Sequence, residues 1–255
     1  MARVLVTGST RGLGLGTAEE LVKDGHDVVL HARTRERATD VSDLSAKAAG
    51  MVTGDLASER GTRDVAEQVN ALGDLDAVIH NAALYQEPER GETPEGHPLL
   101  FAVNVLAPYL LTVLIRRPSR LIYLSSDMHT GGRATLDDMD WTRRPWNWVQ
   151  AYSDSKLFVT VLSAAVARGW PDVRSNAVNP GWVPTRMGGP NAPDDLTMGH
   201  QTQVWLATSD DAAALVSGKY WFHKQTQRPA EPVNDHTFQD ALVAELARIT
   251  GQPLA

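Results

Sequence analysis

A glycine-rich turn between an apolar run and a helical pattern is the feature that most restricts the fold. Residues 4–6 form the apolar run, and a helical pattern covers 13–24; between them the chain reads Thr7-Gly8-Ser9-Thr10-Arg11-Gly12-Leu13-Gly14. Glycines there allow a sharp bend and let a phosphate group approach the backbone, while the helix offers it free N–H groups and its positive dipole end. The pattern predicts a dinucleotide-binding turn, although glycines also serve ordinary turns.

The remaining apolar runs alternate with helical patterns along the whole chain. This alternation is typical of βαβ units and of a parallel sheet covered on both faces. We predict one domain over 1–255, an α/β Rossmann-like doubly wound parallel sheet of about seven strands. The expected strands are 4–6, 27–31, 50–53, 76–80, 120–124, 174–178 and 219–222, and the expected helices are 13–24, 58–72, 97–115, 151–168, 198–208 and 235–249.

Composition excludes several classes of protein and site. The 255 residues include no cysteine, which removes disulfides and thiolate chemistry, and their net charge of −7 argues against a nucleic-acid partner. No apolar run approaches the length of a membrane span, and no His, Asp or Glu set has metal-ligand spacing. We therefore expect a cytoplasmic protein with no metal site, and the oligomeric state stays open, a homo-oligomer included.

Three polar features lie where chemistry could take place. Tyr152 and Lys156 are four positions apart on a predicted helix, so they share a face, and a nearby ammonium favours the phenolate of a group whose pKa is near 10. Such a pair also occurs on ordinary solvated helix faces. Ser125-Ser126 follows the strand at 120–124, where two serines can also form a plain turn. Asn104 lies within the helix at 97–115, where a buried amide bonded to backbone is the alternative interpretation.

Together these features resemble the short-chain dehydrogenase/reductase family. The glycine turn has the family's TGxxxGxG spacing, and Tyr152-Ser153-Asp154-Ser155-Lys156 matches its YxxxK motif. The resemblance runs from Arg3 to about Phe222 and leaves the last part of the chain unassigned. It implies that Tyr152 and Lys156 are catalytic, with Ser126, the second serine of its pair. It also implies that Asn104 kinks its helix and holds a water in a proton relay to the lysine.

The resemblance also implies a set of cofactor-binding residues. Gly54-Asp55-Leu56 stands where the family's aspartate bonds the adenine, although Asp55 could instead cap a helix, with Ser58 as competitor. His80-Asn81-Ala82-Ala83 is similar to the family's NNAG segment with two substitutions. Asn179-Pro180-Gly181-Trp182-Val183-Pro184-Thr185 is similar to the PGxxxT segment that holds the nicotinamide carboxamide, and is otherwise an ordinary turn. The expected cofactor residues are Gly8, Ser9, Thr10, Arg11, Gly12, Leu13, Gly14, Arg33, Asp55, Leu56, Asn81, Ala82, Ala83, Tyr152, Lys156, Pro180, Gly181, Val183 and Thr185.

The end of the second expected strand favours NADP(H) over NAD(H). NAD-selective members of this fold place a carboxylate there to bond the ribose 2′-OH, whereas an arginine suits a 2′-phosphate. This strand ends His31-Ala32-Arg33, and Arg11 adds a second cation in the glycine turn. A guanidinium binds phosphate through paired hydrogen bonds.

These features predict an oxidoreductase that moves a hydride between NADP(H) and a small-molecule carbonyl or alcohol. A nucleotide-sensing protein without catalysis is the alternative, because fold does not determine function. Ser126 and Tyr152 lie 26 positions apart, a spacing that resembles the retinol-dehydrogenase-like branch and suggests apolar substrates. Three tryptophans in this interval either line a pocket or pack the segment onto the domain: Trp141, Trp146 and Trp148. We expect His129 at the surface and assign no role to His223 or Lys224.

Overall fold

One eight-stranded sheet forms the centre of the molecule in the computed structural model, which describes residues 1–254. The spatial order is β3-β2-β1-β4-β5-β6-β7-β8, and every neighbouring pair is parallel except β7 with β8. The order reverses beside β1, which puts the carboxyl ends of β1 and β4 at a topological switch point where ligands bind in such sheets. The strands are β1 (Arg3–Val6), β2 (Asp27–Ala32), β3 (Gly50–Thr53), β4 (Ala77–His80), β5 (Arg120–Leu124), β6 (Arg174–Asn179), β7 (Tyr220–Phe222) and β8 (Gln225–Gln227).

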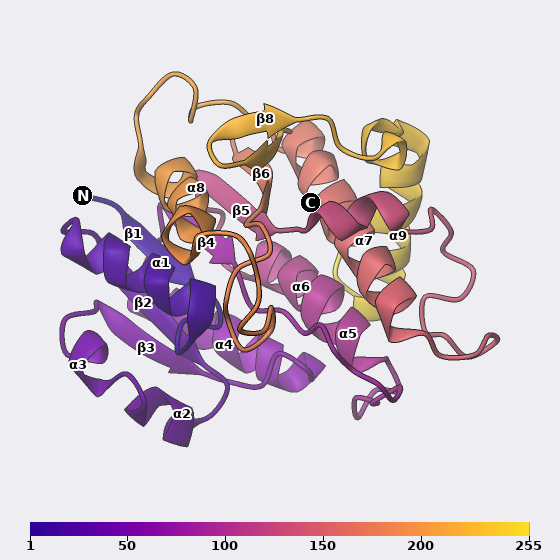
Figure 1. Ribbon diagram of the computed structural model, residues 1–255, viewed down its shortest axis with the longest axis horizontal. Helices are drawn as coiled ribbons and strands as arrows, with labels where there is room; N and C mark the ends of the chain where they lie inside the picture. Colours follow the sequence, from indigo (N-terminus) through magenta and orange to yellow (C-terminus); the bar gives the residue numbers. More distant parts are fainter. Residues whose placement is uncertain (255) are drawn as a thin grey trace.

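Helices cover both faces of this sheet (Figure 1). On one face α1 packs beside α8, and on the other α4, α6 and α7 lie side by side, with α9 against α7. The α-helices are α1 (Gly12–Lys23), α2 (Arg35–Thr39), α3 (Ser42–Ser45), α4 (Glu59–Leu72), α5 (Leu99–Phe101), α6 (Ala107–Leu114), α7 (Trp148–Gly169), α8 (Leu196–Thr208) and α9 (His236–Thr250). A π turn, η1 (Ala102–Leu106), joins α5 to α6, and the 3₁₀ turns are η2 (Asp127–Gly131) and η3 (Glu231–Asn234).

The side chains of β1 show how the sheet divides the apolar core in two. Val4 and Val6 pack with α1 and α8, whereas Leu5 between them packs with the helices of the opposite face. All three are fully buried. Successive residues of a strand point to opposite faces, so a strand covered on both sides needs an unbroken apolar run. The predicted fold class is therefore confirmed.

The structure adds two short helices, α2 and α3, to the expected elements and corrects them in two further places. The eighth strand, β8, is polar and exposed, so it carries no apolar signal, and it forms because His223 and Lys224 take positive φ angles in a two-residue hairpin turn. The expected helix 97–115 is divided by η1, whose widened turn includes Asn104. Such π turns are frequent at functional sites.

Helix α9 covers the outer side of α7 and supplies the last large part of the core. Leu242 and Leu246 are fully buried, and the Phe238 ring lies 6.4 Å from that of Phe158 on α7. The chain end is held as well, because the Tyr109 hydroxyl of α6 donates a 2.6 Å hydrogen bond to the carbonyl of Gln252.

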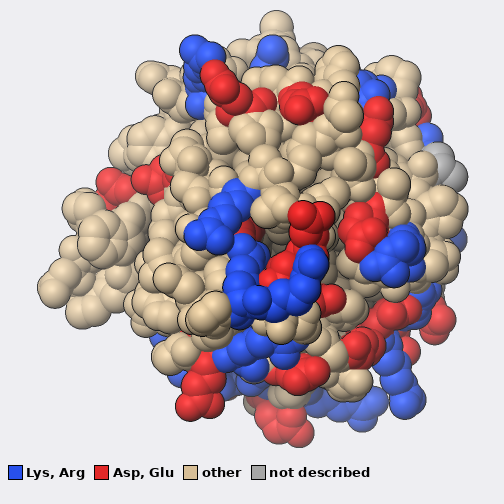
Figure 2. Space-filling model, turned by 90° about the vertical axis from the view of Figure 1, so that its right-hand side faces the viewer, with Lys and Arg blue, Asp and Glu red and all other residues tan. Residues whose placement is uncertain are grey.

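Charged side chains of both signs interleave on the face shown in Figure 2, with large uncharged areas around them. This face therefore presents no continuous field of one sign. Throughout residues 1–254, no helix combines the length and the apolar character needed to cross a membrane.

Candidate active site

The backbone of the glycine turn is not covered by side chains. Gly8 and Gly12 have φ angles of +65° and +54°, the left-handed region that side chains disfavour. A Cβ on Gly14 would lie 2.3 Å from the carbonyl oxygen of Gly8 and 2.4 Å from Nδ2 of Asn81. Only glycine fits at position 14, and the turn has the form that close approach of a phosphate group requires.

Helix α1 differs from the other long helices in how it begins. Its N-cap residue, Arg11, makes no capping bond through its side chain, and its first turn carries no acidic residue. By contrast, α4, α7, α8 and α9 are each capped by a side chain, from Ser58, Asn147, Asp195 and Asp235 respectively. The first N–H groups of α1 are therefore left to an anion, and the residues present fit a dinucleotide pyrophosphate.

The structure brings three predicted cofactor segments to this turn. The hydroxyl of Thr7 accepts hydrogen bonds from the N–H groups of Asn81 and Ala82, at 2.9 and 3.0 Å, and Asn81 Nδ2 donates to the Thr7 carbonyl at 2.8 Å. A Cβ on Gly12 would lie 3.3 Å from the methyl group of Thr185. The loops after β1, β4 and β6 thus meet at one edge of the sheet.

A buried histidine, missed as a site residue from sequence, holds the turn in place. His31 Nδ1 accepts a hydrogen bond from the N–H of Gly8 at 2.9 Å, and Nε2 donates to the Gly54 carbonyl at 3.0 Å. This pattern requires the neutral ring, and burial also lowers the pKa of His31. A histidine in an apolar strand, directly beside the turn, was the available signal.

Two arginines are expected near a 2′-phosphate, and they differ in whether an ion-pair partner already holds them. Arg33 is exposed and forms no hydrogen bond or ion pair within the described part of the chain. Arg11, in contrast, pairs with Asp40 at 3.1 Å, and Arg37 reaches the same oxygen at 3.2 Å. Asp40 therefore competes with any phosphate for Arg11 but leaves Arg33 free.

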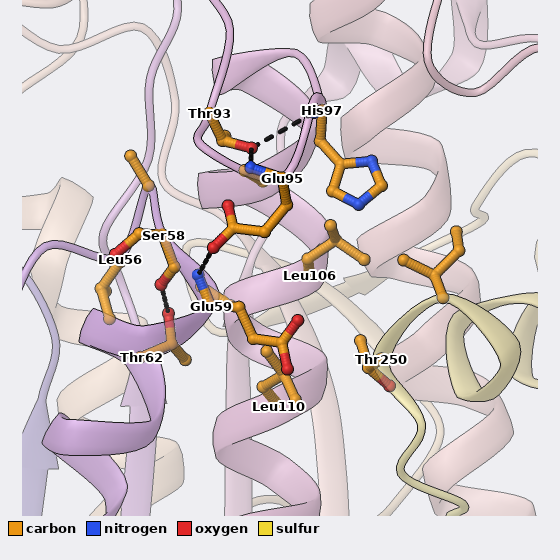
Figure 3. A pocket seen from close by; sticks show the side chains of 14 residues that line it. Leu56, Ser58, Glu59, Thr62, Thr93, Glu95, His97, Leu106, Leu110 and Thr250 are labelled. Atoms are coloured by element: carbon orange, nitrogen blue, oxygen red, sulfur yellow. Dashed lines mark hydrogen bonds between the residues drawn. The ribbon is translucent and has the colours of Figure 1, made fainter.

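Asp55 and Leu56 are neighbours in sequence but differ in burial. Asp55 is exposed and its Oδ1 accepts a bond from the N–H of Ala57 at 3.0 Å, while Ser58 is the residue that caps α4. The capping alternative for Asp55 is therefore wrong. Leu56 is buried and lines a small hollow between the start of α4, α6 and the end of α9 (Figure 3). None of the four predicted catalytic residues lines that hollow.

The loop after β6 begins with a tight turn at the predicted nicotinamide segment. Gly181 has a φ of +84°, and its N–H donates to Oδ1 of Asn179 at 3.0 Å. Val183 is buried, and the Thr185 hydroxyl accepts a bond from the N–H of Gly188 at 3.2 Å. Pro180 lies close to α8, because its carbonyl oxygen would be 3.1 Å from a Cβ on Gly199.

At the reaction end, Tyr152 lies beside Ser126. Tyr152 is on the first turns of α7 and is 7% exposed. Burial raises the pKa of its phenol well above the ordinary value, and the neighbouring Ser126 side chain offsets this only in part. Ser125 points the other way, into the core, where its hydroxyl bonds that of Thr160 at 2.6 Å. Of the two serines, only Ser126 therefore reaches the tyrosine.

Lys156 lies one helical turn further along α7 and is buried beneath the site. Its ammonium group is 5.5 Å from the centre of the Tyr152 ring and donates a 2.7 Å hydrogen bond to the carbonyl of Leu124. Burial lowers the pKa of Lys156 to about 7. Burial raises the pKa of Tyr152 in the chain alone, so the expected lowering of that pKa by this ammonium stays a prediction.

Asn104 occupies the π turn between α5 and α6. Its Oδ1 accepts from the N–H of Leu84 at 2.8 Å, and its Nδ2 donates to the Leu84 carbonyl and to the Ser155 hydroxyl, both at 3.0 Å. The side chain therefore ties the loop after β4 to α7, next to Tyr152. With both amide atoms engaged, the water relay expected at this residue stays a prediction.

The three tryptophans of the segment before α7 divide between two roles. Trp141 and Trp146 pack against each other, ring centres 5.3 Å apart, and Trp146 Nε1 donates to the Glu87 carbonyl at 2.9 Å. These two hold the segment on the domain. Trp148 instead contacts the Tyr85 ring, which lies edge-on at 4.6 Å from the ring of Tyr152. Tyr85, which sequence analysis missed, therefore connects this aromatic group to the site.

Three further residues at the reaction end were misjudged or missed. The expected surface position of His129 is wrong: it is 1% exposed, with Nδ1 donating to the Ser126 carbonyl at 2.7 Å and Nε2 accepting from the N–H of Ala230 at 3.0 Å. Asp127 accepts a hydrogen bond from the Ser126 hydroxyl at 3.2 Å. Tyr220 of β7 packs its ring 4.6 Å from that of His129. The contacts of His129 with Ala230 and Tyr220 join segments about a hundred positions apart, which local sequence patterns do not reveal.

Comparison with known proteins defines the class to which this arrangement belongs. A family model described as short chain dehydrogenase matches residues 2–195. The short-chain dehydrogenase chyC of Penicillium rubens is 40% identical over 254 residues, covering 98% of each chain. The chain therefore belongs to the short-chain dehydrogenase/reductase family.

Further relatives place it within that family. Human retinol dehydrogenase 13 is 30% identical over 283 residues, covering 97% of this chain and 84% of the relative. The expected likeness to the retinol-dehydrogenase-like branch is confirmed. Among solved structures, a protein from Mycobacterium paratuberculosis has a TM-score of 0.85 at 23% identity, covering 100% of this chain and 95% of that one, which supports the fold.

Proposed function

We propose that this protein is an NADP(H)-dependent oxidoreductase that transfers a hydride between the nicotinamide and the carbonyl or alcohol carbon of an apolar small molecule. The observation that carries the proposal is the group formed by Ser126, Tyr152 and Lys156 on the same sheet edge as the uncapped start of α1. A binding protein that senses nucleotides would need only the second of these features.

The chain's own groups can supply everything the reaction needs besides the hydride. The bound NADP(H) would supply or accept that hydride at its nicotinamide ring. In the reducing direction the Ser126 hydroxyl holds the carbonyl oxygen, and Tyr152 donates the proton that the oxygen takes up. A raised phenol pKa keeps Tyr152 protonated, as an acid must be. Lys156, fixed by the Leu124 carbonyl, keeps a cation below the phenol when it is protonated.

The preference for NADP(H) rests on Arg33. Its guanidinium follows β2 directly, is exposed, and has no partner in residues 1–254 that a phosphate would have to displace. β2 ends at Ala32, so no carboxylate occupies the place that would bond a 2′-OH. Two solved structures of this fold are described as complexes with NADPH and with NADP, at 20% and 21% identity.

The apolar character of the substrate rests on the side chains around Tyr152. Tyr85 and Trp148 form an aromatic wall on one side. The loop after β6 carries two exposed apolar side chains, Trp182 at 59% and Met187 at 38% exposure. Exposed apolar groups near polar reactive groups are typical of ligand sites.

The test is oxidation of NADPH, followed at 340 nm, with a panel of aromatic and long-chain aldehydes and ketones. We expect turnover with some members of the panel, and we expect Tyr152→Phe to lower kcat at least 100-fold while the Kd for NADPH stays within about threefold. The matched control is Tyr109→Phe, which removes a phenol hydroxyl that bonds the Gln252 carbonyl and none of the predicted catalytic residues. Tight NADPH binding without turnover of any carbonyl would favour the sensing protein, and activity above a tenth in Tyr152→Phe would reject the assigned acid.

A further inference from the structure

A carboxylate stands beside the proposed proton donor. The Ser126 hydroxyl, which lies beside Tyr152, donates to Oδ1 of Asp127 at 3.2 Å. The charge of Asp127 helps to raise the pKa of Tyr152. Nothing in the proposed chemistry requires a negative charge there.

No cation of the chain neutralises this carboxylate. Asp127 is exposed, and among the described residues it forms no ion pair with Lys, Arg or His. The nearby His129 is held neutral, because its Nε2 accepts a hydrogen bond from a backbone N–H while Nδ1 donates to a carbonyl. Lys156 is directed to the Leu124 carbonyl. The charge of Asp127 therefore acts on whatever occupies the space above Ser126.

A second group lies beside the same turn. Tyr220 is 6% exposed, and its hydroxyl has no hydrogen-bond partner among the described residues. Its ring packs 4.6 Å from that of His129, whose Nδ1 donates to the Ser126 carbonyl, so Tyr220 lies at the reaction end. Buried hydroxyls without a partner are rare and costly, so a ligand atom that bonds this one would gain affinity.

We propose that Asp127 selects among apolar carbonyl compounds by charge: the enzyme prefers those that also carry a cationic, ammonium-type group near the reacting carbonyl and rejects anionic ones, and the Tyr220 hydroxyl contacts the same part of the substrate. This inference rests on the proposed function. A cation would give Asp127 the partner that the described residues do not provide, whereas an anion would face an uncompensated carboxylate.

The experiment compares three benzaldehydes that differ at the para position: trimethylammonium, carboxamide and carboxylate. In the unmodified enzyme, kcat/KM should be higher for the cationic aldehyde than for the anionic one. Asp127→Asn should lower the ratio of these two values about tenfold, which corresponds to about 1.4 kcal/mol. Comparing ratios between variants cancels the intrinsic reactivity of each aldehyde. The effect of Asp127→Asn on this ratio should be smaller in 0.5 M NaCl, because salt screens exposed charges.

The matched control is Asp137→Asn. Asp137 is an exposed carboxylate in the same segment and belongs to none of the groups assigned to the site, and its substitution changes the net charge equally. It should leave the ratio within about twofold of the unmodified enzyme. Equal ratios in the unmodified enzyme and Asp127→Asn, or equal shifts in both variants, would overturn the inference.

Binding without turnover separates this inference from the proposed function. Benzyltrimethylammonium and benzoate are titrated against the NADPH complex, with tryptophan fluorescence as the signal. The cation should bind more tightly, and Asp127→Asn should remove the difference even if no aldehyde is reduced. Tyr220→Phe should weaken the cation several-fold without lowering Tm, because its hydroxyl has no partner in the fold to lose. Equal binding of the two ions, or a lower Tm with unchanged binding in Tyr220→Phe, would contradict the respective assignment.

Discussion

The two ends of the site are built from different parts of the chain. At the nucleotide end the working groups are main-chain N–H groups, exposed because Gly8, Gly12 and Gly14 carry no side chain and Arg11 does not cap its helix. At the reaction end they are side chains, and α7, which carries two of them, is capped by Asn147 in the ordinary way. The nucleotide end therefore depends on backbone groups that no side chain covers, and the reaction end depends on particular side chains.

The sharpest test of this difference adds one carbon atom to the nucleotide end. Gly14→Ala should weaken NADPH binding at least 100-fold and lower Tm, because the new Cβ meets the Gly8 carbonyl at 2.3 Å. Gly169→Ala is the control: no atom lies within 4 Å of its added Cβ. Isothermal titration and thermal denaturation measure both effects. Unchanged affinity in Gly14→Ala would mean that this turn does not hold the cofactor.

Arg33 is the one expected exception at the nucleotide end, because there a side chain sets selectivity. The unmodified protein should bind NADPH at least tenfold more tightly than NADH. Arg33→Ala should lower this preference for NADPH about tenfold, which corresponds to about 1.4 kcal/mol. Arg60→Ala, at a guanidinium that is 92% exposed, should leave the preference unchanged. Equal dissociation constants for the two cofactors in the unmodified protein would reject the NADP(H) assignment.

At the reaction end, two tryptophans of the same segment should separate function from packing. Trp148→Ala should raise KM for bulky apolar carbonyls about threefold to tenfold with a small change in Tm, since Trp148 meets Tyr85 beside Tyr152. Trp141→Ala should instead lower stability by about 3–5 kcal/mol, because this ring is buried and stacks under Arg144. Steady-state kinetics and chemical denaturation distinguish the two outcomes. The reverse pattern would place the substrate on the other side of the segment.

The smallest expected effect concerns the charge of Lys156. Its pKa is lowered by burial to about 7 in the folded chain, against about 10.5 when unfolded, so between these values the unfolded chain binds more protons and stability rises with pH. Below pH 7 the cost of the buried charge is present in full. Lys156→Met should therefore raise the Tm of the ligand-free protein by a few degrees at pH 6 and by about half as much at pH 9, because the cost disappears only above about pH 10.5. A difference independent of pH would contradict the buried, titrating amine.

The sequence was sufficient for most of the nucleotide end. The strands β1 and β4 are apolar apart from Arg3 and His80 at one end of each, and a glycine turn directly after a strand has few alternatives. His31 was missed because its two bonds go to Gly8 and Gly54, each 23 positions away. The polar strand β8 was missed because it is paired through a turn with positive φ angles that His and Lys seldom adopt.

Prediction was less complete at the reaction end, for a physical reason. The motif residues Ser126, Tyr152 and Lys156 follow from local spacing and a family resemblance. Tyr220 and His129 meet only because β7 lies beside β6 and the chain returns past η2, and their burial follows from that tertiary contact. Asp127 has no unusual local pattern, so only its bond to Ser126 distinguishes it from other surface carboxylates.

Helix α9 also fixes when the fold can be completed during synthesis. Leu242 and Leu246 cover α7, yet they leave the ribosome after every other element of the sheet and its helices. Until then the outer side of α7 remains exposed as an apolar surface, a typical binding target for chaperones. A chain interrupted before His236 would carry every predicted catalytic residue and still lack the cover of the helix that bears two of them. Such a truncated product should be recovered bound to chaperones or aggregated, although its motifs are intact.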